Sequence, residues 1–197
     1  MATRNILKDG ERGLTKKSRD VTEYNKRLHQ LIDDMRETLI EANGLGLAAP
    51  QVGVLRRVVL IVDSSDDGIA DDPGAVNEET AFEELSDEEL YEHINSKIIE
   101  LINPEIITAD GEQTGKEGCL SVPGVYGVVT RPNVVRVKAQ DRHGKTFELE
   151  TSELTARAVC HEVDHLNGVI FTSVAERILT EDELAGYDDE NKSQGND

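Results

Sequence analysis

The chain has 197 residues, of which 37% are hydrophobic and 4% aromatic, with no Trp, so we expect one domain with an aliphatic core. Its net charge of -19 comes without a Lys/Arg stripe for phosphates, which excludes direct nucleic-acid binding as a primary function. No apolar run is long enough for a signal peptide or a membrane span, so we predict a cytoplasmic protein that does not bind membranes.

The negative charge is concentrated in two segments. Residues 64–96 hold 12 Asp and Glu and no Lys or Arg, and residues 181–197 hold 7 acidic residues against one Lys. The rest of the chain is therefore close to neutral. We predict a single folded domain over residues 1–179 that carries an acidic insertion at 64–96, followed by an acidic, flexible tail at 180–197.

An amphipathic helix is predicted at residues 23–42. Thr22 fits the N-cap position, apolar residues follow at spacings of three and four, and Asn43 with Gly44 ends the pattern. The apolar stripe consists of Leu28, Leu31, Ile32, Met35 and Leu39.

Four strands are predicted before the C-terminal part of the chain. The β-branched run at 57–63 is typical of a buried strand, and 98–107 is a second strand in which Pro104 indicates an edge or a bend. Residues 134–140 and 146–150 flank a turn that contains Gly, so they are expected to form a hairpin.

A short helix is predicted inside the acidic insertion, at residues 87–95. Ser86 and Glu89 fit a capping box, and Leu85 and Leu90 are spaced as a hydrophobic staple. A longer helix is predicted at 153–166 in the C-terminal part, where apolar residues lie on most sides, so this helix should be buried. Asn167 and Gly168 end it, and residues 169–174 are interpreted as a final strand.

The buried helix carries the sequence His161-Glu162-Val163-Asp164-His165, an HExxH pattern. Side chains four residues apart share one helix face, so both imidazoles can bind one metal ion while Glu162 reaches a water beside it. The same five-residue pattern can arise by chance in a helix whose two histidines only make hydrogen bonds in the core. The pattern favours a metal site.

A catalytic metal of this kind needs a third protein ligand. In a zincin-type metallopeptidase it would be a downstream carboxylate, here Glu176, Glu181 or Glu183, but these lie in or near the acidic tail. Cys119 is the better candidate because a thiolate binds zinc or ferrous iron strongly. A third alternative is a non-enzymatic domain that binds a basic partner through its acidic segments and has a Cys119–Cys160 disulfide.

Three segments together resemble the signature motifs of the peptide deformylase family: Gly44 to Gln51, Glu117 to Ser121 and His161 to His165. The resemblance extends over roughly residues 1–175 and omits much of the insertion. It implies an α+β domain in which small, mostly antiparallel sheets pack around the HExxH helix. It also implies hydrolysis of the N-formyl group from formylmethionine at the N-termini of nascent peptides. A transient association with the ribosome is a further interaction that the resemblance suggests.

The resemblance further implies the roles of individual residues. Cys119, His161 and His165 would bind one divalent metal, natively Fe²⁺, with Zn²⁺, Ni²⁺ or Co²⁺ as alternatives, and Glu162 would be the general base. The Gln51 side chain and the backbone N–H of Leu120 would stabilise negative charge on the formyl oxygen. The implied substrate-binding residues are Gly44, Leu45, Gly46, Gly115, Gly118, Leu154 and Ala158.

Residues next to the implied ligands have predicted supporting roles. Glu117 and Asp164 could both pair with Arg131 and so orient the ligands, although ion pairs on the surface would use the same residues. Cys160 precedes His161 by one residue, so its side chain points about 100° away around the helix and should pack rather than bind metal.

The acidic insertion should be dispensable for chemistry. Replacing residues 66–84 with a short Gly/Ser linker is expected to leave turnover of a formylated tripeptide within a few-fold, because unpaired carboxylates favour solvated conformations and loop length affects stability only logarithmically. Steady-state assays with formyl-Met-Ala-Ser would measure this. A steep rise in KM, at unchanged metal content and thermal stability, would instead mean that the insertion contacts the substrate.

Overall fold

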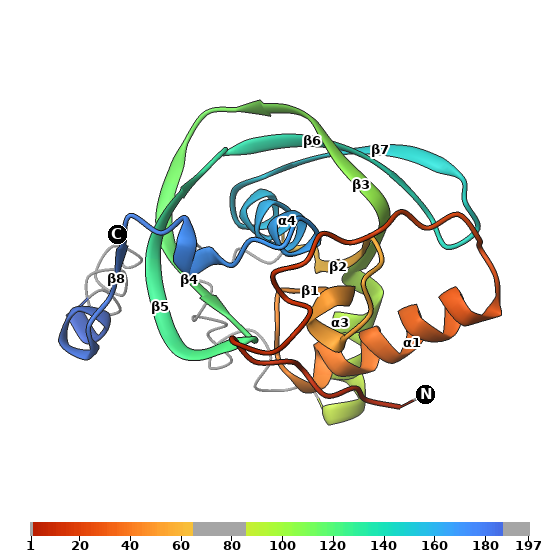
Figure 1. The fold of residues 1–197 in the computed structure, drawn as a ribbon, viewed down its shortest axis with the longest axis horizontal. Helices are drawn as coiled ribbons and strands as arrows, with labels where there is room; N and C mark the ends of the chain where they lie inside the picture. Colours follow the sequence, from red (N-terminus) through yellow and green to blue (C-terminus); the bar gives the residue numbers. More distant parts are fainter. Residues whose placement is uncertain (1, 65–85, 187–197) are drawn as a thin grey trace.

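A computed structural model of the chain describes residues 2–64 and 86–186, and it has an α+β fold in which two antiparallel sheets surround one helix (Figure 1). The larger sheet has the strand order β1-β2-β3-β6-β7, and the smaller has the order β4-β5-β8. The elements are α1 (Lys26–Glu41), β1 (Gly46–Ala48), the 3-10 helix η1 (Ala49–Val52), β2 (Val58–Val62), α3 (Asp87–Lys97), β3 (Ile98–Asp110), β4 (Gln113–Cys119), β5 (Val122–Arg131), β6 (Val134–Gln140), β7 (Thr146–Ser152), α4 (Glu153–Leu166), the 3-10 helix η2 (Phe171–Ser173) and β8 (Arg177–Ile178).

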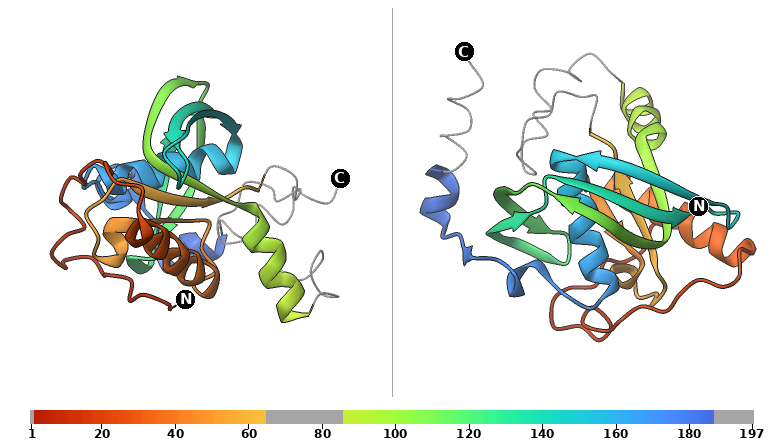
Figure 2. Two further views of the ribbon diagram at one scale, coloured as in Figure 1. Left: turned by 90° about the vertical axis from the view of Figure 1, so that its right-hand side faces the viewer. Right: turned by 90° about the horizontal axis from the view of Figure 1, so that it is seen from above.

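The helix α4 lies in the centre of the molecule, as its apolar sequence predicts. Eleven of its fourteen residues are buried, and its apolar face packs on the inner faces of β2, β3 and β6. Figures 1 and 2 show β3, β5 and β6 curving around this helix. A rigid helix in the core can hold catalytic side chains in fixed positions.

The helix α1 covers the other face of the larger sheet. Its predicted apolar stripe is confirmed, since all five of the named side chains are buried. The predicted N-cap is wrong: the helix begins three residues later, and the side chain of Asn25 rather than Thr22 accepts the N–H groups of Arg27 and Leu28. An Asn can cap these donors as well as a Thr can, so local pattern alone did not distinguish the two positions.

The strand β3 is long and lies between β2 and β6. Pro104 falls in a register shift between Ile102 and Glu105, beyond the last residue that pairs with β2, so the bend predicted from this proline is confirmed. The bulge removes the need for the proline to donate a ladder hydrogen bond, which allows it inside a sheet. The predicted helix at 87–95 is confirmed as α3 with its capping box, while Leu85 of the proposed staple lies outside the described residues.

Two further predictions need correction in the C-terminal half. Residues 169–174 do not form a strand, because Phe171 begins the short helix η2 and its ring is buried beside Leu14 and Ile170. The strands β4 and β5 were not predicted, since β4 contains glycines and charged residues instead of alternating apolar ones. The glycines of β4 lack the large apolar side chains from which a strand is predicted, because other side chains of the functional site occupy that space.

The start of the acidic tail also has local structure. Residues 181–186 are helical, and Thr180 and Glu183 cap this turn reciprocally through side chain and backbone. The rest of the tail lies outside the described residues, so its flexibility stays a prediction. Within the described ranges, we find no helix with the length and apolarity that crossing a membrane would require.

Candidate active site

Three distant segments meet at one cavity of about 460 Å³. The first is the turn around β1 and η1, the second is the end of β4 with the loop after it, and the third is α4. Eleven predicted site residues line the cavity: Cys119 and the ten named below. Ile6 and Lys8 of the N-terminal segment line it as well. The predicted lining residues are Gly44, Leu45, Gly46, Gln51, Gly118, Leu120, Leu154, Ala158, His161 and Glu162.

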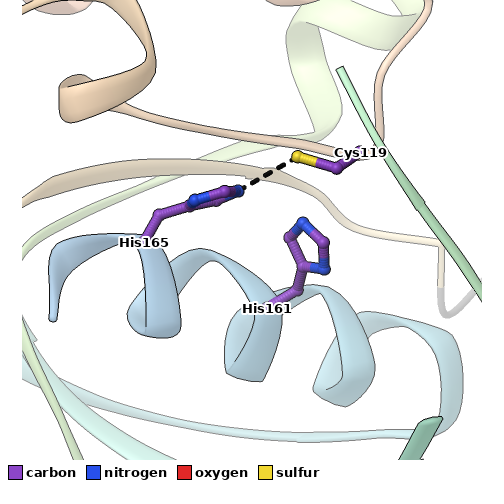
Figure 3. A group of neighbouring side chains, drawn as sticks. All are labelled: Cys119, His161 and His165. Atoms are coloured by element: carbon purple, nitrogen blue, oxygen red, sulfur yellow. Dashed lines mark hydrogen bonds between the residues drawn. The ribbon is translucent and has the colours of Figure 1, made fainter. Parts of the chain in front are cut away.

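The side chains of Cys119, His161 and His165 converge (Figure 3); Cys119 and His161 line the cavity, and His165 is buried and does not line it. Their ligand atoms all lie within 4.8 Å of one another, and Cys119 Sγ is 3.2 Å from His165 Nε2. Burial lowers the pKa of His165 to about 3, so its imidazole is neutral and has a lone pair for a metal ion. One thiolate and two imidazoles at this spacing fit one divalent transition metal.

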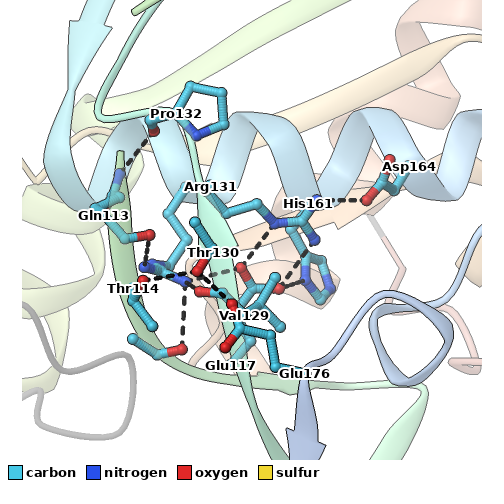
Figure 4. Close-up of polar contacts among 12 residues, drawn as sticks. Gln113, Thr114, Glu117, Val129, Thr130, Arg131, Pro132, His161, Asp164 and Glu176 are labelled. Carbon is cyan, nitrogen blue, oxygen red and sulfur yellow. Dashed lines mark hydrogen bonds and ion pairs between the residues drawn. The ribbon is translucent and has the colours of Figure 1, made fainter. Parts of the chain in front are cut away.

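A buried ion-pair network holds the first histidine in place (Figure 4). Glu117 Oε2 lies 3.1 Å from His161 Nδ1, so a proton on that nitrogen leaves Nε2 free to bind a metal ion. Arg131 donates to Glu117 at 2.9 Å and to Asp164 at 2.6 Å, which confirms the predicted trio. All three lie mostly out of solvent, so this is not an ordinary surface ion pair.

The charges in this network reinforce one another. Burial alone would raise the pKa of Glu117, but hydrogen bonds from His161 and Arg131 outweigh it and lower the pKa to about 2. Burial alone would lower the pKa of His161, but its hydrogen bonds with Cys119 and Glu117 raise the pKa to about 10. A metal ion that binds His161 must therefore displace a proton.

Glu162 faces the backbone of Gly46. A Cβ atom at position 46 would lie 2.6 Å from Glu162 Oε1, so glycine is required for the carboxylate to occupy this place. Burial raises the pKa of Glu162 to about 7, against the opposing effect of His161. Its Oε2 atom is buried and has no hydrogen-bond partner among the described residues. The group is suited to accept a proton near neutral pH.

Gln51 is held in one orientation by its neighbours. Its Oε1 accepts the backbone N–H of Ala48 at 2.8 Å, so the amide nitrogen must face the other way. That nitrogen lies 3.6 Å from Cys119 Sγ and 3.3 Å from Ser121 Oγ. Gln51 is buried at the cavity wall.

Two glycines of β4 make room for other side chains. A Cβ at Gly118 would lie 2.8 Å from the ring of Tyr126. Gly115 does not line the cavity, and a Cβ there would lie 3.0 Å from Arg157 Nη2. Gly115 therefore makes room for a buried arginine, and nothing in this geometry supports its assignment as a substrate-binding residue.

Arg157 is a site residue that the sequence reasoning missed. Its Nη1 donates to Glu117 at 3.0 Å and to the carbonyl of Val129 at 3.0 Å, which ties α4 to β4 and β5. A charged residue four positions before His161, on a helix that is apolar on most sides, was the available signal, because such a charge must find a buried partner.

The alternative ligands do not reach the site. Glu176 accepts a hydrogen bond from Thr130, and Glu183 caps the helical turn at 180 and pairs with Arg177. Cys160 packs in the core, where burial raises the pKa of its thiol to about 11, and both cysteines are free thiols. The metallopeptidase ligand set and the disulfide-stapled binding domain are therefore wrong.

Comparisons with known proteins agree with this geometry. The family model described as polypeptide deformylase matches residues 3–180. The chain is 47% identical over 191 residues to a peptide deformylase of Lachnoclostridium phytofermentans, covering 96% of this chain and 98% of that protein. It is 43% identical over 185 residues to peptide deformylase 1 of Bacillus subtilis, covering 94% and 98%.

Solved structures give the same result. A peptide deformylase from Legionella pneumophila has a TM-score of 0.70 and 33% identity, covering 100% of this chain and 99% of that one. A Met-Ala-Ser-bound peptide deformylase from Acinetobacter baumannii has a TM-score of 0.70 and 30% identity, covering 88% and 98%. We conclude that this chain belongs to the polypeptide deformylase family and is a metal-dependent hydrolase that removes the formyl group from the N-termini of nascent peptides.

Proposed function

We propose that Cys119, His161 and His165 bind a single Fe²⁺ ion in the native enzyme, with Zn²⁺, Ni²⁺ or Co²⁺ as substitutes. The observation that carries this is the convergence of one sulfur and two imidazoles beside Glu162 at a cavity. When bound, the metal would act as a Lewis acid that polarises the formyl group and makes water more acidic. The soft thiolate in the donor set supports a transition metal over Mg²⁺ or Ca²⁺.

Glu162 acts as the general base in this proposal. Its unpartnered Oε2 takes a proton from the attacking water and then delivers it to the amine of the departing methionine, while formate leaves. The Gln51 Nε2 atom and the backbone N–H of Leu120 donate to the formyl oxygen as it gains negative charge. The Ala48 N–H supports this role because it fixes which end of the Gln51 amide faces the site.

The substrate peptide lies as an added strand next to β1, which is an edge of the larger sheet. Its backbone runs between Gly46 and Gly118, with Gly44 in the same wall of the cavity. The methionine side chain contacts Leu45, Leu154 and Ala158, which give that part of the cavity an apolar lining. The complex of a relative with Met-Ala-Ser supports a tripeptide product of this kind.

The assay that tests this function is formate release from formyl-Met-Ala-Ser by protein purified without oxygen and loaded with Fe²⁺. We expect turnover with the formyl peptide and none with acetyl-Met-Ala-Ser, because the extra methyl group of the acetyl peptide would need space beside the metal ligands. Since nascent chains are the substrate, we also expect the enzyme to act in the cytoplasm. Sedimentation with ribosomes would test a transient association. Equal activity on both peptides would contradict the proposed substrate.

Gly46→Ala is expected to lower kcat by about 10²-fold while the metal content stays the same. The new methyl group would lie within 2.6 Å of Glu162 Oε1, so the carboxylate has to move, and a shift of about 1 Å can cost this much. Gly186→Ala is the matched control, since a Cβ there meets no atom within 4 Å and the backbone does not have a positive φ. Wild-type kcat in Gly46→Ala would show that the position of Glu162 tolerates the added methyl group.

A further inference from the structure

The N-terminal segment ties together the two loops that carry Gln51 and Leu120. We call residues 6–9 the N-terminal arm. The backbone N–H of Leu7 donates to the carbonyl of Gln51 at 2.8 Å, and Figure 1 shows the arm, in red, passing from α1 toward the end of β4. The N–H of Asp9 donates to the carbonyl of Ser121 at 2.8 Å. The arm therefore bridges the first and second motifs.

Lys8 adds a charged contact in the middle of this bridge. Its Nζ atom donates to the carbonyl oxygen of Leu120 at 2.8 Å, and its side chain lines the cavity. The backbone around it is fixed by a turn, in which the Lys8 N–H donates to a Glu11 carboxylate oxygen and the Glu11 N–H donates to the Lys8 carbonyl. A hydrogen bond with an ionised donor is stronger than one between neutral groups.

The arm itself is firmly attached. The Arg4 N–H donates to Thr38 Oγ1 at 2.9 Å, and the Arg4 guanidinium pairs with Asp34 at 2.8 Å. Ile6 packs against the core under α1, and Leu7 packs against the cluster that includes Cys119. The arm can therefore hold the loops it touches.

The loop held by Lys8 has one internal hydrogen bond to a side chain, from the Ser121 N–H to Cys119 Sγ at 3.4 Å. The pairing of β4 with β5 shifts register between Gly118 and Cys119, and Cys119 then pairs with Val122. Leu120 and Ser121 are thus the two central residues of a tight turn, and ladder hydrogen bonds do not fix the orientation of their peptide groups. Both carbonyls of this turn are bound by the arm instead.

We propose that Lys8 is a positioning residue for deformylation: by holding the Leu120 carbonyl, its ammonium fixes the turn so that the Leu120 N–H points at the formyl oxygen. The inference rests on the proposed oxyanion role of Gln51 and Leu120. A donor that is already oriented needs no reorganisation when charge develops, so loosening the turn should lower kcat. The Lys8 ammonium acts through Leu120 and does not itself touch the substrate.

Lys8→Met tests this, because it keeps an unbranched stem of similar length and removes the ammonium. We expect kcat for formyl-Met-Ala-Ser to fall about tenfold, with KM within about twofold of wild type, since the interaction acts in the transition state. Metal content and the thermal midpoint should not change, because Lys8 is exposed. Lys8→Arg should restore most of kcat, and Lys17→Met, at an exposed lysine outside the cavity lining, should match wild type.

Unchanged kcat in Lys8→Met would overturn the inference, as would an equal loss in Lys17→Met. A rise in KM alone would also overturn it and would make Lys8 a substrate contact. Gln51→Ala, assayed in parallel, separates the two levels of the argument. If Gln51→Ala loses turnover and Lys8→Met does not, only the role of Lys8 is wrong. If Gln51→Ala keeps the wild-type kcat, the oxyanion site is wrong and the inference falls with it.

Discussion

Cys119→Ala is expected to abolish both metal retention and formate release. It removes one of three protein ligands, and the two histidines that remain on α4 offer only two donors to a metal that needs three. Changes to residues that only orient a ligand cost about 10 to 100-fold in metal affinity or activity, so the loss of a ligand should exceed about 100-fold. Metal analysis of the purified variant and the formyl-Met-Ala-Ser assay measure the two effects.

Cys160→Ala is the matched control for this variant. It makes the same chemical change at the other cysteine, which packs in the core and contributes no atom to the group of ligands. We expect it to keep the metal and wild-type turnover, with a modest loss of thermal stability from the small cavity. Stoichiometric metal in Cys119→Ala would defeat the ligand assignment.

Glu162→Gln is expected to keep the metal and to lose about 10²- to 10⁴-fold in kcat, the range that a positioned general base contributes. The amide has nearly the shape of the carboxylate, so it should fit the space beside Gly46, but it cannot accept a proton from water at neutral pH. Metal content, kcat and KM should be measured on the same preparation. Full activity would mean that another group is the base.

Glu176→Gln provides the control for charge removal. Of the three downstream carboxylates that could bind metal in a metallopeptidase, Glu176 is the first after the HExxH pattern in the sequence. It is exposed and accepts a hydrogen bond from Thr130. We expect metal content and turnover to be those of the wild-type enzyme. If Glu162→Gln lost its metal while Glu176→Gln did not, Glu162 would have to be reassigned as a ligand or a structural support.

The sequence by itself determined the features that depend on neighbours along the chain. The spacing of His161 and His165 places them on one helix face, and the apolar surroundings predict that this helix is buried. The stripe of α1, the capping box at Ser86 and the hairpin of β6 and β7 follow from equally local rules. Thiolate chemistry made Cys119 the candidate third ligand and the resemblance to a family supported it, since no local rule connects it with His165, 46 residues away.

Only the tertiary structure decided which distant residues share a space. Gly46 is needed because Glu162 arrives from another element, and Gly115 because Arg157 fills the position that a side chain would take. Gly115 and Gly118 also made β4 look unlike a strand, since small residues carry no pattern of burial. The contact of Lys8 with the loop after β4 is not marked by any periodic pattern in the sequence either. Such contacts depend on how elements that are distant in the sequence pack together, so the pattern of residues within a short segment cannot predict them.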